Sequence, residues 1–416
     1  MTQRYDHGVR PRTGRLFELV LVSAALGVGS AELARGQESA ARNAPAQQSL
    51  ASVSSDLARA RLWGDAPVRA IRGVTIGPIE SALHPGRGYG TEACARTMHE
   101  AVRLGANWVS ITPFGRTYDL APTGIDLSFE APFEHNRLAV VRAVRQAHAE
   151  GLRVLLVPHL WVETGQWRGE IDPGSDAGWA RWAKAYRRFV LSWAQVARDA
   201  PVDMLAVGVE LRSWVTTGYA PLFVDIIRAV RDTYPGPLTY AANWDDADKT
   251  VIWGEVDAIG INAFYPLADT ENARPDQLDK GAARVIRRMR KLAAAWHKPI
   301  LFNEFGYTTR KDPALRPWEW PEHMSRVVVD QQAQADAYQA LLNVLVNEPG
   351  FGGLFVWRLY ADPDDVSQEA EWGFSPRGKL AELVLRDAFA THWAADGPRP
   401  VGSALESVRA VRVGDY

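Results

Sequence analysis

The sequence predicts an α/β fold of the (β/α)8 type, a TIM barrel formed by one domain. Short runs that are apolar almost throughout alternate with longer stretches of helical period, and there are eight such runs between residues 68 and 392. Runs of this kind are typical of parallel strands that are covered on both faces. Eight strands alternating with helices favour a closed barrel, and an open doubly wound sheet is the alternative.

The eight expected strands cover residues 70–76, 107–113, 153–158, 204–209, 238–242, 258–262, 299–303 and 353–357. The stretches between them repeat apolar residues every three or four positions. Trp179, Trp182 and Tyr186, for example, form one face of a helix expected over 176–198. The connection between the fifth and sixth strands leaves room only for a short helix.

The two ends of the chain are expected to lie outside this domain. Several arginines precede an apolar run at 19–31, and small residues follow, which is the order of a secretory signal. The run is too short for a membrane span. We therefore expect a signal peptide at 1–36, a low-complexity linker at 37–67, the barrel domain at 68–395 and a C-terminal tail at 396–416. The mature protein would be secreted or lie in the periplasm or cell envelope, without a membrane span.

Composition excludes several classes of function. The chain has 47 Lys and Arg against 49 Asp and Glu, a net charge of −2, which gives no electrostatic reason to expect a nucleic-acid partner. Cys94 is the single cysteine, and no Cys/His spacing matches a zinc site. No glycine-rich phosphate loop occurs. We therefore expect neither a cofactor nor a metal, and the sequence does not predict an oligomeric state.

In a barrel of this type the active site lies at the carboxyl ends of the strands. The residues that follow the expected strands there are rich in carboxylates, aromatic rings and amides. They are, in strand order, Ile79 and Glu80; Phe114, Arg116 and Tyr118; His159 and Trp161; Glu210, Arg212 and Trp214; Asn243 and Trp244; Asn262 and Tyr265; Glu304 and Tyr307; Trp357 and Arg358.

Glu210 and Glu304 stand out in this set, because they follow the fourth and seventh strands, which lie nearly opposite each other. Glycosidic bond cleavage needs one carboxylic acid to protonate the leaving oxygen and one carboxylate to attack or to activate water. Aromatic faces match the C–H faces of sugar rings, so Trp161 and Trp214 are candidate substrate-binding residues. His159 is either a sugar contact or a structural hydrogen-bonding group.

At these residues the sequence resembles the retaining glycoside hydrolases of clan A and, more narrowly, glycoside hydrolase family 113, a β-mannanase family. The resemblance covers about residues 68–393. The matching segments are RGVTIGP at 72–78, WVSITPF at 108–114, VGVE at 207–210, YAANWD at 240–245, IGINAFYPL at 259–267, NEFGY at 303–307 and GLFVWRL at 353–359.

The resemblance implies a role for each matching residue. Glu210 would be the acid/base, Glu304 the nucleophile, and Tyr265 a hydrogen-bond donor to that nucleophile. Trp357 would form the platform under the sugar at the cleavage point, and Asn243 and Trp244 would line the cleft. The chain departs from the wider clan at Val209, where an asparagine usually precedes the acid/base. This departure speaks against a glucan-type substrate and is compatible with family 113.

The leading hypothesis is a retaining β-glycosidase that hydrolyses a β-linked polysaccharide, with β-1,4-mannan or glucomannan implied by the resemblance. Two alternatives stay open. The barrel could be catalytically idle and bind polysaccharide or peptidoglycan, because a fold alone does not fix a function. It could also use the same mechanism on another β-glycan.

Overall fold

The computed structural model describes residues 70–77, 86–129, 131–319, 327–364 and 371–390. The expected signal peptide, linker and C-terminal tail lie outside the described residues, and so do Ile79 and Glu80. Among the described helices, none combines the length and the hydrophobicity of a membrane-spanning segment.

The central sheet is a closed barrel of parallel strands, as the sequence predicts. Its members pair in the order β1-β10-β9-β8-β7-β6-β4-β2, and β1 pairs with β2 to close the ring. The strands are β1 (Ile71–Gly77), β2 (Trp108–Ile111), β4 (Arg153–Leu156), β6 (Met204–Val209), β7 (Leu238–Asn243), β8 (Ala258–Asn262), β9 (Ile300–Phe305) and β10 (Phe351–Tyr360). Because both edges are paired, the open doubly wound sheet is excluded.

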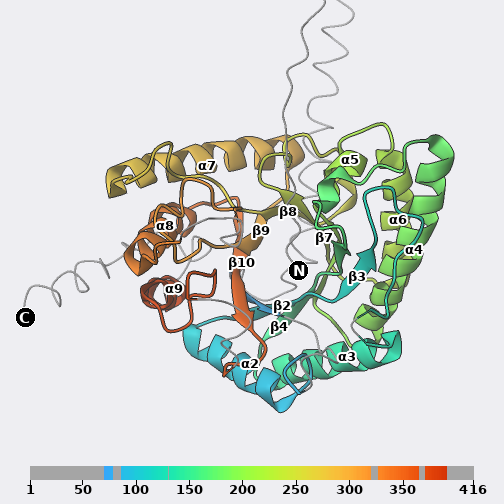
Figure 1. Cartoon of the computed structure of the whole chain (residues 1–416), viewed down its shortest axis with the longest axis horizontal. Coiled ribbons are helices and arrows are strands. Elements are labelled where there is room, and N and C mark those ends of the chain that lie inside the picture. The colour runs from blue at the N-terminus through green and yellow to red at the C-terminus, as the bar shows by residue number, and fades with distance from the viewer. Residues whose placement is uncertain (1–69, 78–85, 130, 320–326, 365–370, 391–416) are drawn as a thin grey trace, which may run out of the picture. The chain divides into compact units, whose positions relative to one another are not determined.

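Helices surround the barrel, and Figure 1 shows them as a ring outside the strands. They are α2 (Glu92–Leu104), α3 (Phe133–Ala149), α4 (Asp176–Asp199), α5 (Arg212–Val215), α6 (Ala220–Thr233), α7 (Pro275–Trp296), α8 (Gln331–Leu345) and α9 (Leu380–Ala390). Short 3-10 turns, η1 (Arg168–Glu170) and η2 (Trp253–Glu255), lie in two of the connections. The second of these is all that forms between β7 and β8, where the sequence leaves little room.

Helix boundaries follow local sequence signals. The Thr91 side chain accepts a hydrogen bond from the Cys94 N–H at the start of α2, and Gly105 ends that helix in the left-handed conformation with φ of 95°. Ser175 caps α4 in the same way, through the Gly178 N–H. The apolar face of α4 is buried, as its period predicts.

The barrel interior is filled by side chains and is separate from the layer between strands and helices. One buried cluster inside the barrel includes Ile71, Leu155, Met204 and Phe355. A larger cluster joins the outer faces of the strands to the helices. The barrel is therefore a packed support, and its chemistry must lie in the residues at its mouth.

Two barrel strands continue beyond the barrel into a small second sheet, which the sequence analysis did not predict. It pairs β3 (Phe114–Thr117) with β5 (His159–Val162), and Phe114 lies opposite His159. Pro113 and Pro158 separate this sheet from β2 and β4. Since proline donates no backbone hydrogen bond, each interrupts the ladder for one position before pairing resumes. The second sheet carries His159 and Trp161 above the barrel mouth.

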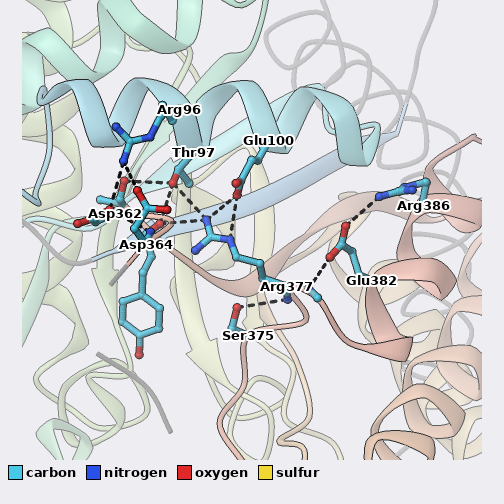
Figure 2. Close-up of polar contacts among 12 residues, drawn as sticks. Arg96, Thr97, Glu100, Asp362, Asp364, Ser375, Arg377, Glu382 and Arg386 are labelled. Carbon is cyan, nitrogen blue, oxygen red and sulfur yellow. Dashed lines mark hydrogen bonds and ion pairs between the residues drawn. The ribbon is translucent and has the colours of Figure 1, made fainter. Parts of the chain in front are cut away.

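A group of polar contacts, the seam at Arg377, joins α2 to the segment between β10 and α9. Arg377 donates through Nε to Glu100 at 2.9 Å and through Nη2 to the Thr97 hydroxyl at 3.1 Å. Arg96 on α2 pairs with Asp364 at 2.7 Å, as Figure 2 shows. A surface hollow beside Arg377, lined also by Leu104 and Arg386, lies between α2 and α9 on the outside of the barrel. Its lining includes neither of the candidate catalytic carboxylates.

Candidate active site

Glu210 is the first residue after β6, and its backbone has φ of 51°. A positive φ is uncommon for a residue other than glycine, and such strain is concentrated at functional sites. The Glu210 N–H donates to the Ala241 carbonyl at 2.7 Å, and the next N–H, of Leu211, donates to the Tyr240 hydroxyl at 2.7 Å. These contacts hold the strained residue against β7.

Glu304 lies within β9, at a place where the pairing of this strand is irregular on both sides. The register shifts between Ile261 and Asn262 of β8 and between Leu354 and Val356 of β10. Glu304 is the register partner of Asn262 at the end of β8. Gly306 follows two residues later, and a Cβ there would lie 2.6 Å from the Trp357 carbonyl oxygen. This close approach explains the glycine of the Glu-x-Gly-Tyr pattern, since only glycine lets the chain at the end of β9 pass so close to β10.

The side chain of Glu210 accepts three hydrogen bonds. Its Oε2 accepts from the Trp167 indole N–H at 2.9 Å and from Arg168 Nη1 at 3.0 Å. Its Oε1 accepts from Asn262 Nδ2 at 2.9 Å. Because Asn262 is the register partner of Glu304, this amide links the surroundings of the two carboxylates.

Glu304 has a different environment, although each of the two glutamates is 8% exposed. Its Oε1 lies 3.5 Å from His159 Nε2, beyond the usual hydrogen-bond range. Burial, and then the neighbouring Glu210 carboxylate, raise the pKa of Glu304 to about 8, against the opposing influence of Arg168 and Arg358. The charge of Glu210 therefore contributes to the raised pKa of Glu304.

His159 is buried beside the pair and is uncharged. Burial, with a smaller contribution from the Arg168 and Arg358 cations, lowers the pKa of His159 well below its usual value. Its ring stacks on Trp357 at 6.1 Å and meets Phe114 edge-on at 5.3 Å. Neither His159 Nε2 nor Asn262 Oδ1 has a hydrogen-bond partner among the described residues. Such buried polar atoms beside two carboxylates mark the place where a polar ligand or water is needed.

Aromatic side chains lie around this centre at different depths. Trp357 is buried against Phe264 and Phe374. Trp161 on β5 is 47% exposed and lies 5.9 Å from the Arg116 guanidinium.

On β7, the Asn243 side-chain amide donates to Asp245 at 2.9 Å. The following residue, Trp244, stacks on Trp318 with ring centroids 5.0 Å apart, and Trp318 is 43% exposed. Trp161 and Trp318 thus offer exposed ring surface.

The expectation for Trp214 is wrong. This residue is 1% exposed and packs among Trp179, Trp182 and Phe223 in the layer between the helices. Its indole N–H donates to the Tyr219 carbonyl. The residue lies on the short helix α5, one turn beyond Glu210, and this turn directs its ring into the core, where it cannot contact a sugar.

Tyr265 is also buried, and its position differs from the one that the resemblance implies. Its ring packs against Trp244 and Phe302, in the cluster between strands and helices. Among the described residues, no hydrogen bond joins Tyr265 to Glu304. The donor between the two carboxylates is Asn262, three residues earlier, whose side chain reaches Glu210.

Sequence reasoning missed Trp167 and Arg168, and it gave Asn262 no role. Asn262 could have been found, because it is the last residue of an expected strand. Trp167 and Arg168 lie in the connection after β5, at the start of η1. No periodicity marks that segment, and its only signal is a tryptophan beside an arginine in the sequence Trp-Arg-Gly-Glu.

The described residues contain no group of three or more His, Cys, Asp or Glu side chains that could hold a metal ion. The side chains described at the mouth are two buried carboxylates, a neutral imidazole, amide and indole donors, and aromatic rings. This set suits general acid/base and nucleophilic attack at a sugar acetal.

The barrel has the fold of several solved structures. A family 113 β-mannanase, AaManA from Alicyclobacillus acidocaldarius, solved in complex with ManMIm, is 26% identical with a TM-score of 0.67, over 77% of this chain and 97% of that one. A family 113 β-1,4-mannanase is 22% identical, with a TM-score of 0.67, over 78% of this chain and all of the other. A family 5 mannosidase from Rhizomucor miehei shares the fold at 12% identity and a TM-score of 0.57, over 77% of this chain and 92% of that one.

A comparison with curated proteins gives no match. The sequence model of one family, however, matches most of the chain. That model is Glycoside Hydrolase Family 113, and it matches residues 82–379, which include Glu210, Glu304 and every other residue of the site described above. The chain therefore belongs to Glycoside Hydrolase Family 113 and is a glycoside hydrolase.

Proposed function

We propose that this enzyme is a retaining endo-β-mannanase that cleaves β-1,4-mannan or glucomannan by double displacement. The observation that carries the proposal is the pair of buried glutamates at the ends of β6 and β9, linked through Asn262. The two family 113 structures named above, which are β-mannanases, support mannan as the substrate.

Each glutamate has one role in each step. Glu304 attacks the anomeric carbon while Glu210 protonates the glycosidic oxygen, so that the C–O bond breaks and a glycosyl-enzyme ester forms. Glu210, now a carboxylate, takes a proton from water, and the water oxygen replaces the Glu304 carboxylate at the anomeric carbon. Two inversions give net retention.

The surrounding residues would bind and orient the glycan. His159 Nε2 and Asn262 Oδ1, which lack partners among the described residues, would hydrogen-bond hydroxyl groups of the sugar at the cleavage point. Trp357 would offer its face beneath that sugar. The more exposed rings of Trp161 and of the Trp244–Trp318 stack would bind sugars farther along the chain.

The first test is a panel of β-mannan, glucomannan, xylan and β-glucan, with the sizes of the products measured over time. We expect rapid shortening of mannan and glucomannan into oligosaccharides and little action on the other two. Preferred cleavage of xylan or β-glucan would assign the same mechanism to another β-glycan. Release of single sugars from one end would contradict endo action.

The second test distinguishes an enzyme from an idle binding barrel. A 2-deoxy-2-fluoro mannoside with a good leaving group should add the mass of one fluorosugar to the peptide that contains Glu304. A crystal structure should place the two carboxyl groups about 5–5.5 Å apart, as retaining enzymes require. Binding of the glycan without labelling or hydrolysis would support the idle barrel.

We also propose that the enzyme acts outside the cytoplasm. The basis is the order of basic, apolar and small residues in the first 36 positions. Sequencing the N-terminus of protein recovered from its native host should find a chain that starts after Ala31 or Gly36. An intact Met1 or Thr2 in soluble cytosolic protein would reject export.

A further inference from the structure

Two neighbouring residues from one connection hold the same oxygen of Glu210. The Trp167 indole N–H and Arg168 Nη1 both donate to Oε2, at 2.9 and 3.0 Å, while Asn262 Nδ2 donates to the other oxygen at 2.9 Å. Each of these atoms can only donate. A protonated Glu210 would need an acceptor for its own O–H, and none of the three provides one. The three contacts therefore stabilise the carboxylate form of Glu210 relative to its acid form.

Both donors are themselves fixed. Arg168 donates through Nε to the Leu160 carbonyl of β5 at 2.8 Å, so only its far end is directed at Glu210. The Trp167 ring lies under the Arg212 guanidinium at 4.3 Å, and Arg212 pairs with Asp246 at 2.8 Å. Gly169 leaves room for this ring, because a Cβ there would collide with it. Trp167 and Arg168 are therefore each held in place by contacts other than those with Glu210.

Arg168 is also a cation in direct contact with the glutamate pair, through Glu210. Its salt bridge to Glu210 is partly buried, with side chains 17% and 11% exposed, and its charge lowers the pKa of Glu304 as well. The other titratable or charged groups that face the pair are His159 from β5, Arg358 from β10, Asp246 after β7 and Tyr240 on β7. Of these, His159 is neutral, and Asp246 is occupied by Arg212.

We propose that Arg168 is a positioning residue that sets the ionisation state of the glutamate pair: it holds Glu210 Oε2, and its positive charge favours the ionised form of both carboxylates. The inference rests on the proposed roles of the two glutamates.

The test is the pH dependence of kcat/KM on a β-1,4-mannooligosaccharide, measured for the wild type, Arg168→Gln, Arg168→Met and Arg168→Lys. Loss of the cation destabilises both carboxylates. We therefore expect both limbs of the bell-shaped profile to move to higher pH by about one unit in the Gln and Met variants. The Lys variant keeps the charge and should stay within a few tenths of a unit of the wild type.

Arg228→Gln is the matched control. Arg228 is an exposed arginine on α6 that pairs with Glu255 on the outside of the barrel, so its loss removes the same charge far from the pair. Its profile should coincide with that of the wild type. A purely structural role of Arg168 would lower the rate at every pH without moving the limbs, and that result in a folded Gln or Met variant would overturn the inference.

A measurement without turnover separates this inference from the proposed function. In a Glu210→Gln background, the Glu304 carboxyl carbon can be titrated by ¹³C NMR, its signal being identified by its loss in Glu304→Gln. Adding Arg168→Gln should raise the pKa of Glu304 by about one unit. An unchanged titration would overturn the inference even if the enzyme cleaves mannan. A shifted titration in a protein that hydrolyses no glycan would support the charge effect and reject the proposed function.

Discussion

Glu210 and Glu304 are equally buried, yet the chain surrounds them in opposite ways. Glu210 sits on a strained turn and accepts hydrogen bonds from Trp167, Arg168 and Asn262. Glu304 sits within β9, and its carboxylate lies 3.5 Å from His159 Nε2. Glu210 thus accepts hydrogen bonds from three side chains before any ligand arrives. For Glu304 the Asn262 side chain and the nearby arginines offset burial only in part, so its pKa stays raised.

This difference suggests that the two glutamates are positioned for different chemical roles. Backbone pairing of β9 with β8 and β10 fixes the position of Glu304, which suits a group that must attack along one line. The position and charge of Glu210 depend on side chains from the connection after β5 and from β8. A group held by replaceable contacts can exchange its proton when those contacts change, as an acid/base must do in each cycle.

The largest expected effect is the loss of Glu304. Glu304→Ala removes the nucleophile, so kcat should fall at least about 10⁴-fold for polysaccharide and for aryl mannosides alike. Azide should restore activity by taking the place of the carboxylate, and the glycosyl azide should have inverted configuration. Rescue with retained configuration would show that Glu304 is not the nucleophile.

Glu210→Ala should separate substrates by leaving group. Hydrolysis of polysaccharide should fall about 10³-fold, because the sugar leaving group needs a proton. A dinitrophenyl mannoside needs little protonation, so its first step should survive and give a burst of phenol followed by slow turnover. Azide should then yield a product of retained configuration. Equal loss on both substrates, with no burst and no rescue, would contradict the assigned role.

Asn262 is the group that touches both environments, so its removal should affect both steps. Asn262→Ala takes one donor from Glu210 and opens space beside Glu304, and we expect a fall of about 10²-fold in kcat on mannan. Asn262→Asp has the same shape but places a third carboxylate beside the pair, and should be slower still at neutral pH. An alanine variant within twofold of the wild type would show that the link is only structural.

The smallest effect concerns stability rather than rate. The pKa of Glu304 is raised in the folded state, from 4.5 to about 8, so the folded chain holds a proton that the unfolded chain has lost. The destabilisation caused by this shift is therefore small at pH 5, grows as the pH rises from about 4.5 to about 8, and is constant above pH 8. Glu304→Gln should gain about 2 kcal/mol or more in the free energy of unfolding at pH 8, and less than about 1 kcal/mol at pH 5.

Denaturant unfolding at the two pH values measures this gain. Glu210→Gln is the natural counterpart, because its amide would place an NH₂ group among existing donors. It should be neutral or destabilising at both pH values. A Glu304→Gln variant that gains nothing between pH 5 and pH 8 would mean that the two carboxylates differ less than their surroundings suggest.

The barrel could be predicted from the sequence because the apolar residues that mark its strands and helices recur at regular intervals. Apolar runs mark the strands, and the position just after each run marks the mouth, so Glu210 and Glu304 could be found by counting strands. Contacts that cross the mouth have no such period. Trp214 was misplaced because one helical turn after Glu210 directs its ring into the core.

Arg168 was overlooked because its link to Glu210 spans 42 positions through an irregular connection. The small sheet of β3 and β5 was likewise hidden, since Pro113 and Pro158 read as strand ends although pairing resumes beyond them. Such features depend on which distant segments meet, and one sequence does not encode that in a readable pattern.

The seam at Arg377 has a consequence for how the chain reaches its fold. The residue bonds Thr97 across 280 positions, and β1 can pair with β10 only after nearly the whole domain has been synthesised. Until then β1 and the most recently made strand both present unpaired edges. Closure of the barrel is therefore a late event on the ribosome, and a chain that stops short of β10 would be left with an open, association-prone sheet.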